Sequence, residues 1–252
     1  EEELEDTAVE PMVGHEHTHT LIYLHAFGRC GQEYHQPLLD KLSPGFPVPW
    51  VEGSGAHFAP GLRVVLPTAP EIKQPWGPTE TSWHVYKESW SNDVGGFESL
   101  EETRNRLADI VQAEVERLGG AGHKVFIGGL SQGCTVALDA YLQNALRFRL
   151  GGFVGCVGFM PSDKQGFMGA TAELEAIMED EEQRSRPIWV TCAEDDQWVP
   201  WGGLAEPSFK RVTSRLPGLS LRTVRGRGHV IDDWEGHLLN DFVKYYTKDR
   251  LE

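Results

Sequence analysis

Hydrophobic residues along this chain fall into short continuous runs separated by longer amphipathic stretches. The runs are typical of strands buried on both faces, and they lie at residues 20–24, 62–66, 124–128, 152–157, 188–192 and 219–224. Apolar residues at helical spacing predict a helix over residues 98–118, and further helices are expected over 132–147, 172–183, 203–215 and 232–248. Strands that alternate with helices predict an α/β fold with a mostly parallel central sheet and helices on both faces.

Three segments fall outside this alternation. Residues 1–16 are acidic, and we expect a disordered or loosely attached tail ahead of a single domain over residues 17–250. Residues 43–61 are rich in Pro and Gly and predict a loop excursion. Residues 68–97 also lack periodicity but contain several tryptophans, so we expect a long, ordered loop that carries function.

The composition narrows the classes of partner. The chain has 252 residues and a formal net charge of −15 at pH 7. A chain this acidic is a poor candidate for binding nucleic acid or anionic lipid, because both require clustered Lys and Arg, so we expect at most transient membrane contact. No apolar run approaches the ~18 residues that span a bilayer. The acidic N-terminus and four cysteines without a C-x-x-C pair favour a cytoplasmic setting.

Three histidines near the N-terminus deserve comparison with a metal site. His15, His17 and His19 form an H-x-H-x-H pattern, which on a strand would place them on one face, where they could hold a metal ion. No matching cluster of carboxylates or cysteines is visible in the sequence, which favours an exposed segment before the first strand. We therefore expect neither a metal nor a cofactor.

The segment Gly129–Gly133 fits the pattern G-x-S-x-G, with a buried strand before it and an apolar helix after it. This context is typical of a sharp turn that raises a serine hydroxyl above the end of a sheet, where the helix dipole favours developing negative charge. We predict that Ser131 is a nucleophile. An oxyanion hole needs two backbone N–H donors, and we expect them from Gln132, which follows the nucleophile, and from Phe27, in the loop after the first strand.

A serine nucleophile needs a base, and the base needs an acid that orients it. In such a fold the three follow in the order Ser, Asp, His, each just after a strand. His229 lies in a glycine-flanked loop after the strand at 219–224, so we predict that it is the base. Asp196 follows the strand at 188–192 and is the candidate acid, with Glu194 and Asp195 as rivals.

Several separated segments resemble, in order, the motifs of the acyl-protein thioesterase, or phospholipase/carboxylesterase, branch of α/β-hydrolases. They are Leu24–Gly28, Leu66–Pro70, Ser82–Trp83, Gly128–Gly133, Asp196–Pro200 and Gly228–His229. The match at 196–200 selects Asp196 over its rivals. Ala26 and Cys134 depart from the pattern, each standing where glycine is common.

The resemblance implies an α/β-hydrolase fold and a serine hydrolase that removes long acyl chains, such as palmitoyl groups, from protein cysteines. S-acylated proteins or lipid esters would then be the substrates. The alternatives are a general carboxylesterase or lysophospholipase, and a non-catalytic binding module with a hydrolase fold. For the acyl pocket we expect walls formed by loop residues near the triad, namely Trp76, Trp83, Met160 and Trp198.

Two runs without Lys or Arg, at residues 1–10 and 173–182, hold 12 of the 38 acidic residues and so account for 12 of the 15 units of net negative charge. Both runs lie apart from the predicted triad in the sequence, so the net charge describes the periphery of the molecule. We therefore expect that deletion of residues 1–10 leaves ester hydrolysis unchanged.

Overall fold

The central feature of the protein is a twisted, mostly parallel β-sheet. The computed structural model describes residues 6–34, 38, 59–89, 91–142, 148–226, 228–229 and 233–247. Among them, seven strands form one sheet in the order β1-β3-β2-β8-β9-β10-β11. The strands are β1 Thr7–Val9, β2 His19–Leu24, β3 Leu62–Leu66, β8 Val125–Leu130, β9 Gly152–Cys156, β10 Ile188–Ala193 and β11 Leu219–Val224. All neighbours pair in parallel except β1, which is antiparallel to β3, so the predicted fold class is confirmed.

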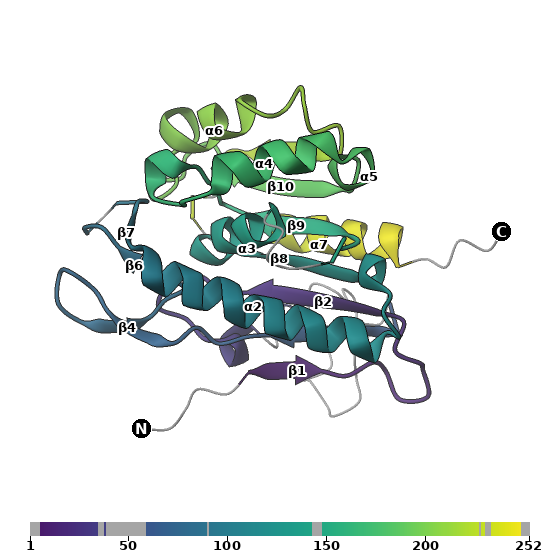
Figure 1. Ribbon diagram of the computed structural model, residues 1–252. Helices are drawn as coiled ribbons and strands as arrows, with labels where there is room; N and C mark the ends of the chain where they lie inside the picture. The colour runs from purple at the N-terminus through teal and green to yellow at the C-terminus, as the bar shows by residue number, and fades with distance from the viewer. Residues whose placement is uncertain are drawn as a thin grey trace.

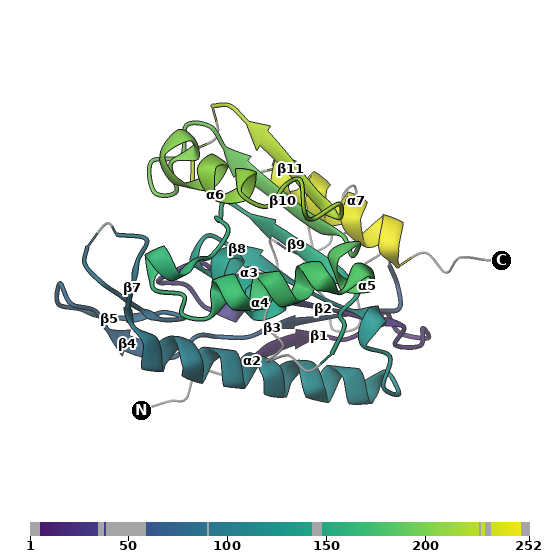
Figure 2. The ribbon, with the colours of Figure 1, turned by 45° about the horizontal axis from the view of Figure 1, so that its top comes forward.

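Helices cover both faces of this sheet (Figures 1 and 2). The helices α2, α3 and α4 lie on one face, and α7 lies on the other. The helices are α2 Phe97–Arg117, α3 Gln132–Leu142, α4 Ala170–Glu179, α5 Glu181–Arg184, α6 Glu206–Lys210 and α7 Asp233–Tyr246. Shorter turns are the 3₁₀-helices η1 Gly122–Lys124 and η3 Asp163–Gln165 and the π-helical turn η4 Trp201–Ala205.

Two hydrophobic cores explain why the strands read as continuous apolar runs. Successive strand residues point to opposite faces, so in β2 Ile22 packs in the core that contains α2 and α3, while Leu21 packs in the core that contains α7. Both residues are fully buried. Because both faces are covered, the alternation of polar and apolar residues seen in one-sided sheets is lost.

The N-terminal segment corrects the expected domain boundary. Residues 1–5 lie outside the described residues, but Thr7–Val9 form β1, with Thr7 opposite Leu66 and Val9 opposite Val64. The expectation of a tail over residues 1–16 is therefore wrong for this strand. Three residues flanked by acids give no periodic signal of their own, and their order comes from pairing with the free edge of β3. The predicted excursion at 43–61 lies outside the described residues except for 59–61.

The segment 68–97 is ordered, and it forms two small antiparallel hairpins. They are β4 Glu71–Lys73 with β5 Thr79–Thr81, and β6 Val85–Tyr86 with β7 Val94–Gly96. The hairpins lie beyond the carboxyl ends of the parallel strands, on the left in Figure 1. The helix predicted at 203–215 is shorter in the structure, since a π-helical turn leads into α6, which ends at Lys210.

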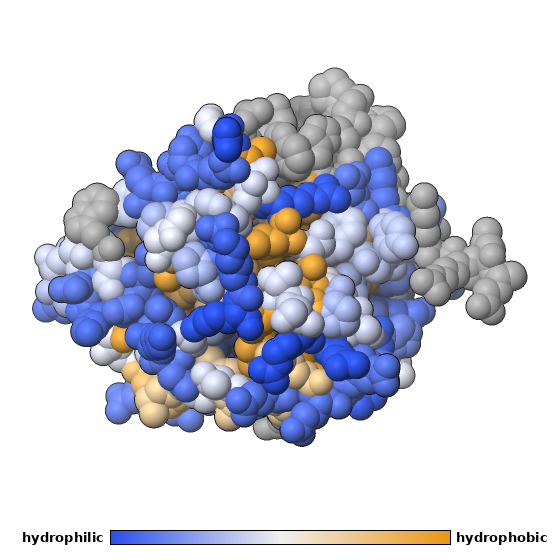
Figure 3. Space-filling model, turned by 90° about the horizontal axis from the view of Figure 1, so that it is seen from above, coloured by the Kyte–Doolittle hydropathy of each residue, from blue (hydrophilic) through white to orange (hydrophobic). Residues whose placement is uncertain are grey.

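The surface seen from above is mostly hydrophilic over the described residues, and hydrophobic residues reach it in small groups (Figure 3). Among the described helices, none combines the length and the hydropathy needed to cross a membrane.

Candidate active site

The turn around Ser131 joins β8, which ends at Leu130, to α3, which begins at Gln132. Ser131 has φ of +56°, a left-handed conformation that non-glycine residues seldom adopt. The glycines beside it allow close packing: a Cβ on Gly133 would lie 2.4 Å from the carbonyl oxygen of His25, and a Cβ on Gly129 would lie 2.6 Å from the backbone of Gly133. The sharp turn predicted from the G-x-S-x-G pattern is therefore present.

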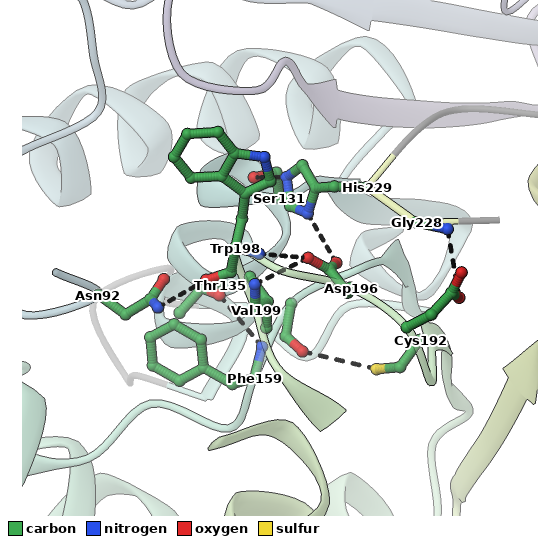
Figure 4. A network of polar contacts seen from close by, with 12 residues as sticks. Asn92, Ser131, Thr135, Phe159, Cys192, Asp196, Trp198, Val199, Gly228 and His229 are labelled. Atoms are coloured by element: carbon green, nitrogen blue, oxygen red, sulfur yellow. Dashed lines mark hydrogen bonds and ion pairs between the residues drawn. The ribbon is translucent and has the colours of Figure 1, made fainter. Parts of the chain in front are cut away.

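Three side chains form a hydrogen-bonded series at this turn (Figure 4). The Nε2 atom of His229 lies 2.6 Å from Ser131 Oγ, and its Nδ1 atom lies 2.7 Å from Asp196 Oδ2. Asp196 is buried, and its other oxygen accepts the backbone N–H groups of Trp198 and Val199 at 2.7 and 2.9 Å. The structure thus brings together the serine, histidine and aspartate that the sequence predicted from three different loops.

The other two acidic residues of this loop, Glu194 and Asp195, form hydrogen bonds with groups other than the His229 ring. Glu194 accepts hydrogen bonds from Arg225 at 2.5 Å and from Thr223 at 3.1 Å. The hydrogen bond from Arg225 lowers the pKa of the Glu194 carboxyl. Asp195 accepts the backbone N–H of Gly228 at 3.3 Å, next to the histidine rather than on it. Asp196 is the acidic residue of this loop whose carboxylate contacts the His229 ring.

The backbone N–H of Phe27, in the loop after β2, donates to no other group within the described part of the chain. The N–H of Ala26 donates to the Tyr34 hydroxyl at 3.2 Å, and the N–H of Gly28 donates to the carbonyl of Thr81 at 2.9 Å. This leaves the N–H of Phe27 between them. Gln132 is the first residue of α3, where an N–H has no partner within the helix. Both residues line the same cavity as Ser131, which fits the two donors expected for an oxyanion hole.

A buried histidine holds this loop in place. The Ala69 N–H donates to His25 Nε2 at 2.9 Å, so the ring proton is on Nδ1, which lies 2.7 Å from the Ala26 carbonyl oxygen. Burial lowers the pKa of His25 to about 4, which keeps the ring neutral. The indole N–H of Trp83 donates to the His25 carbonyl at 2.8 Å, and the centroids of the His25 and Trp83 rings are 4.8 Å apart.

The side chain of Gln132 connects the turn around Ser131 to the segment 68–97. Its Oε1 accepts the backbone N–H of Trp83 at 3.0 Å, and its Nε2 donates to the Ser82 hydroxyl at 3.0 Å. Gln132 is buried, so these bonds are shielded from water. The start of α3 and residues 82–83 therefore form one rigid unit beside Ser131.

A cavity of about 730 Å³ opens onto Ser131 and His229. One side of it is formed by rings in mutual contact, with centroids 4.7–6.1 Å apart. We call these residues the aromatic wall: Phe27, Trp76, His84, Tyr86, Phe159 and Phe167. The mouth of the cavity is more polar, since Arg29, Glu33, Ser89, Ser91 and Asn92 also line it. The cavity has the size and the apolar character of a site for a small molecule or an acyl group.

Two of the four predicted pocket residues line this cavity, and two do not. Trp76 and Trp198 are lining residues and are partly exposed. Trp83 and Met160 are fully buried in the core, so their prediction as pocket walls is wrong. For Met160 the error is a single position, because its neighbour Phe159 lines the cavity.

Most of the aromatic wall was missed because its members lie in hairpins and loops without a regular period. The alternation along the segment 83–86 carries a usable signal, since Trp83 is buried in the core while His84 and Tyr86 line the cavity. Burial lowers the pKa of His84 to about 4 and raises that of the Tyr86 hydroxyl, so both side chains are neutral near pH 7.

Other chemically active residues are accounted for by local contacts. His17 hydrogen-bonds Thr20 at 2.8 Å, and His19 hydrogen-bonds Thr18 at 3.0 Å. Within the described part of the chain, no group of three His, Cys, Asp or Glu residues could hold a metal ion. Cys134 is fully buried, and a Cβ on either Gly155 or Gly158 would lie 2.5 Å from its sulfur, so its environment is tightly packed.

The chain is similar in sequence to known proteins. The model of the phospholipase/carboxylesterase family matches residues 59–247. Over 148 residues the chain is 28% identical to acyl-protein thioesterase 1 of Yarrowia lipolytica, a match that spans 58% of this chain and 59% of that protein, less than two thirds of its length. Over 231 residues it is 23% identical to acyl-protein thioesterase 1 homolog 1 of Dictyostelium discoideum, which covers 90% of both chains.

The fold is also shared with a solved structure. The crystal structure of Zea mays acyl-protein thioesterase 2 superposes with a TM-score of 0.70 at 19% identity, and the match covers 96% of this chain and 99% of that one. The family match extends over most of the sheet and over the segments that supply Ser131, Asp196 and His229. The chain therefore belongs to the phospholipase/carboxylesterase family of α/β-hydrolases, and it is a hydrolase.

Proposed function

We propose that this protein is a serine hydrolase that cleaves long-chain acyl thioesters from S-acylated, including palmitoylated, proteins. The observation that carries the proposal is the hydrogen-bonded series Ser131–His229–Asp196 at a cavity with an aromatic wall. Relatives named acyl-protein thioesterase support the thioester as the bond that is cleaved. The setting that we propose is cytoplasmic, with S-acylated proteins or lipid esters as partners, no nucleic acid, and at most transient contact with membranes.

The first half of the proposed reaction forms an acyl-enzyme. His229 Nε2 takes the proton of Ser131 Oγ, and that oxygen attacks the carbonyl carbon of the thioester. The N–H groups of Phe27 and Gln132 stabilise the negative charge that develops on the carbonyl oxygen. The C–S bond then breaks, the acyl group remains on Ser131, and the thiol leaves with the proton from His229.

The second half releases the acid. His229 takes a proton from water, and the resulting hydroxide attacks the acyl carbon on Ser131. The C–O bond to serine breaks, the proton on His229 returns to Ser131 Oγ, and the fatty acid leaves. Asp196 keeps the Nδ1–H tautomer of His229 through both halves, which is the role that its 2.7 Å contact supports.

The acyl pocket, rather than the triad, decides the substrate class. A thiol has a pKa of about 8.5 and leaves with less acid assistance than an alkoxide, so this site would cleave both thioesters and oxyesters. Each buried methylene contributes ~0.8 kcal/mol, so a long chain gains most from the aromatic wall. The alternative is a general carboxylesterase or lysophospholipase, which the family's own description favours.

The proposal is tested in two steps. A fluorophosphonate probe is expected to label the folded protein at Ser131, and Ser131→Ala is expected to lose labelling and to reduce kcat by about six orders of magnitude. The kcat/KM for an S-palmitoyl peptide is then compared with that for acetyl and butyryl esters. A protein that the probe does not label would be a binding module, and one that is fast on short esters but inert to the palmitoyl peptide would be the general esterase.

A further inference from the structure

The N-terminal strand reaches the same end of the sheet as the candidate active site. Since β1 runs antiparallel to β3, its first residue, Thr7, lies opposite Leu66 at the carboxyl end of β3. The parallel strands all end on this side, and Figure 1 shows β1 at the edge of the sheet. Asp6, just before β1, therefore lies near the loops that form the site, whereas Glu10, just after β1, lies at the far end.

Asp6 and Arg106 hold the backbone of Thr68 from outside the site. The Oδ1 atom of Asp6 accepts the Thr68 N–H at 2.9 Å and also contacts the guanidinium of Arg106. Arg106, on α2, donates to the Thr68 carbonyl oxygen at 2.5 Å. Both backbone polar groups of Thr68 are thus fixed by one ion pair between the N-terminal segment and α2.

From its other side, the segment 68–69 holds the loop after β2. The Gly31 N–H donates to the Thr68 hydroxyl at 3.0 Å, and the Ala69 N–H donates to His25 Nε2 at 2.9 Å. A Cβ on Gly31 would lie only 2.2 Å from the Leu66 carbonyl oxygen, so the loop and the end of β3 are in close contact. Movement of the 68–69 backbone would displace the donor that fixes the His25 ring.

The His25 ring controls the direction of the Phe27 N–H. His25 Nδ1 lies 2.7 Å from the Ala26 carbonyl oxygen, and the ring donates this bond. That carbonyl and the Phe27 N–H belong to the same planar, trans peptide unit, so they point in opposite directions. Fixing the Ala26 carbonyl on one side of the loop therefore fixes the Phe27 N–H on the other side.

We propose that Asp6, together with Arg106, is a positioning residue for the oxyanion hole, acting through Thr68, Ala69 and His25. The inference rests on the proposed function, because it assigns the Phe27 N–H to the oxyanion. It reverses the expectation that residues 1–10 are dispensable for ester hydrolysis. The N-terminal segment would then affect catalysis by positioning the loop after β2, although its acidic composition is typical of a disordered tail.

The test compares three variants by kcat per active site, with sites counted by fluorophosphonate titration. Asp6→Ala removes the acceptor for Thr68 and the partner of Arg106, and we expect kcat to fall about tenfold with KM nearly unchanged. Asp6→Asn keeps an oxygen that can accept the Thr68 N–H, so kcat should stay within about twofold of the wild type. Glu10→Gln is the matched control, since Glu10 pairs with Arg63 just after the same strand but away from the site.

Counting active sites separates positioning from stability. A purely structural role would lower Tm and the fraction of active molecules, whereas positioning lowers kcat in the molecules that titrate. An unchanged kcat per site in Asp6→Ala, or an equal loss in Glu10→Gln, would overturn the inference. Failure of the wild type to titrate would overturn the proposed function itself, and the inference with it, before any variant is compared.

Discussion

At the scale of single residues, two tryptophans that look alike in the sequence have different surroundings. Trp83 is 1% exposed, and its indole N–H donates to the His25 carbonyl, at the start of the loop after β2. Trp198 is 43% exposed and lines the cavity, and its backbone N–H holds Asp196. Only the second side chain is placed to contact a substrate.

Replacing each tryptophan should separate these roles. Trp83→Phe leaves a buried carbonyl without its donor and removes core volume, so we expect the free energy of unfolding to fall by about 2–4 kcal/mol. Trp198→Ala should lower the free energy of unfolding by about 1 kcal/mol or less, because the side chain is half exposed. It should nevertheless raise KM for long acyl esters, because the side chain lines the cavity. Urea unfolding and a series of esters of increasing chain length measure the two effects. A larger change of KM in Trp83→Phe than in Trp198→Ala would contradict this assignment.

The residues that could be predicted from the sequence are those tied to a local pattern. Ser131 is fixed by the glycines that a strained turn requires, and His229 by its place just after a strand. The place after β10 leaves three acids open, and the resemblance at 196–200 selects Asp196 among them. Phe159 and Phe167 have no such constraint, because a pocket wall needs only a ring at the right point in space. The neighbours Phe159 and Met160 differ by one position in sequence, but Phe159 lines the cavity and Met160 does not.

At the scale of elements, the hairpin β6–β7 and the loop after β10 meet across the cavity mouth. The side-chain amide of Asn92 donates to the Trp198 carbonyl at 2.8 Å, although the two residues are 106 positions apart (Figure 4). The same residue, Trp198, donates its N–H to Asp196 at 2.7 Å. Trp198 therefore connects the hairpin β6–β7 to Asp196, whose carboxylate contacts His229.

Removing this bond should loosen the rim without disturbing the core. In Asn92→Ala we expect kcat/KM for long acyl esters to fall about two- to tenfold, the range for one hydrogen bond of about 0.5–1.5 kcal/mol, with short esters less affected. Asn92→Asp keeps the shape but cannot donate to a carbonyl, so it should behave like the alanine variant. Ser89→Ala is the control, because Ser89 also lines the cavity without this bond. Equal losses on short and long esters would show that Asn92 does not act on chain selectivity.

Elements with a full hydrophobic face were predictable, and elements that depend on a partner were not. The buried strands and the helix Phe97–Arg117 agree with the sequence because their apolar residues recur at the period of the element. The strand Thr7–Val9 and the two hairpins contain only two or three residues in each strand, too few to show a period. Their order comes from contacts with segments distant in the sequence, such as the pairing of Thr7 with Leu66.

At the scale of the whole molecule, neutral histidines buried at the site make global stability depend on pH. Burial lowers the pKa of both His25 and His84 to about 4. His84 is packed against the rings of Tyr86 and Phe167, with centroids 4.7 and 5.9 Å away. In the unfolded chain both rings are exposed to water, where the pKa of a histidine is about 6.5.

The unfolded state therefore binds protons more readily than the folded state between these pKa values. The contribution of these histidines to the free energy of unfolding is fully present above about pH 6.5. It is lost as the pH falls towards 4, by about 3 kcal/mol for each buried histidine. His84→Phe keeps a ring at this place in the aromatic wall but removes the titrating group. We expect its free energy of unfolding to fall by about 3 kcal/mol less than that of the wild type between pH 7 and pH 4. Urea unfolding at pH 7 and pH 4 gives the two free energies for each protein. The carboxylates are the same in both, so their titration cancels in the comparison, and an equal loss of stability in the two proteins would show that His84 is not buried in its neutral form.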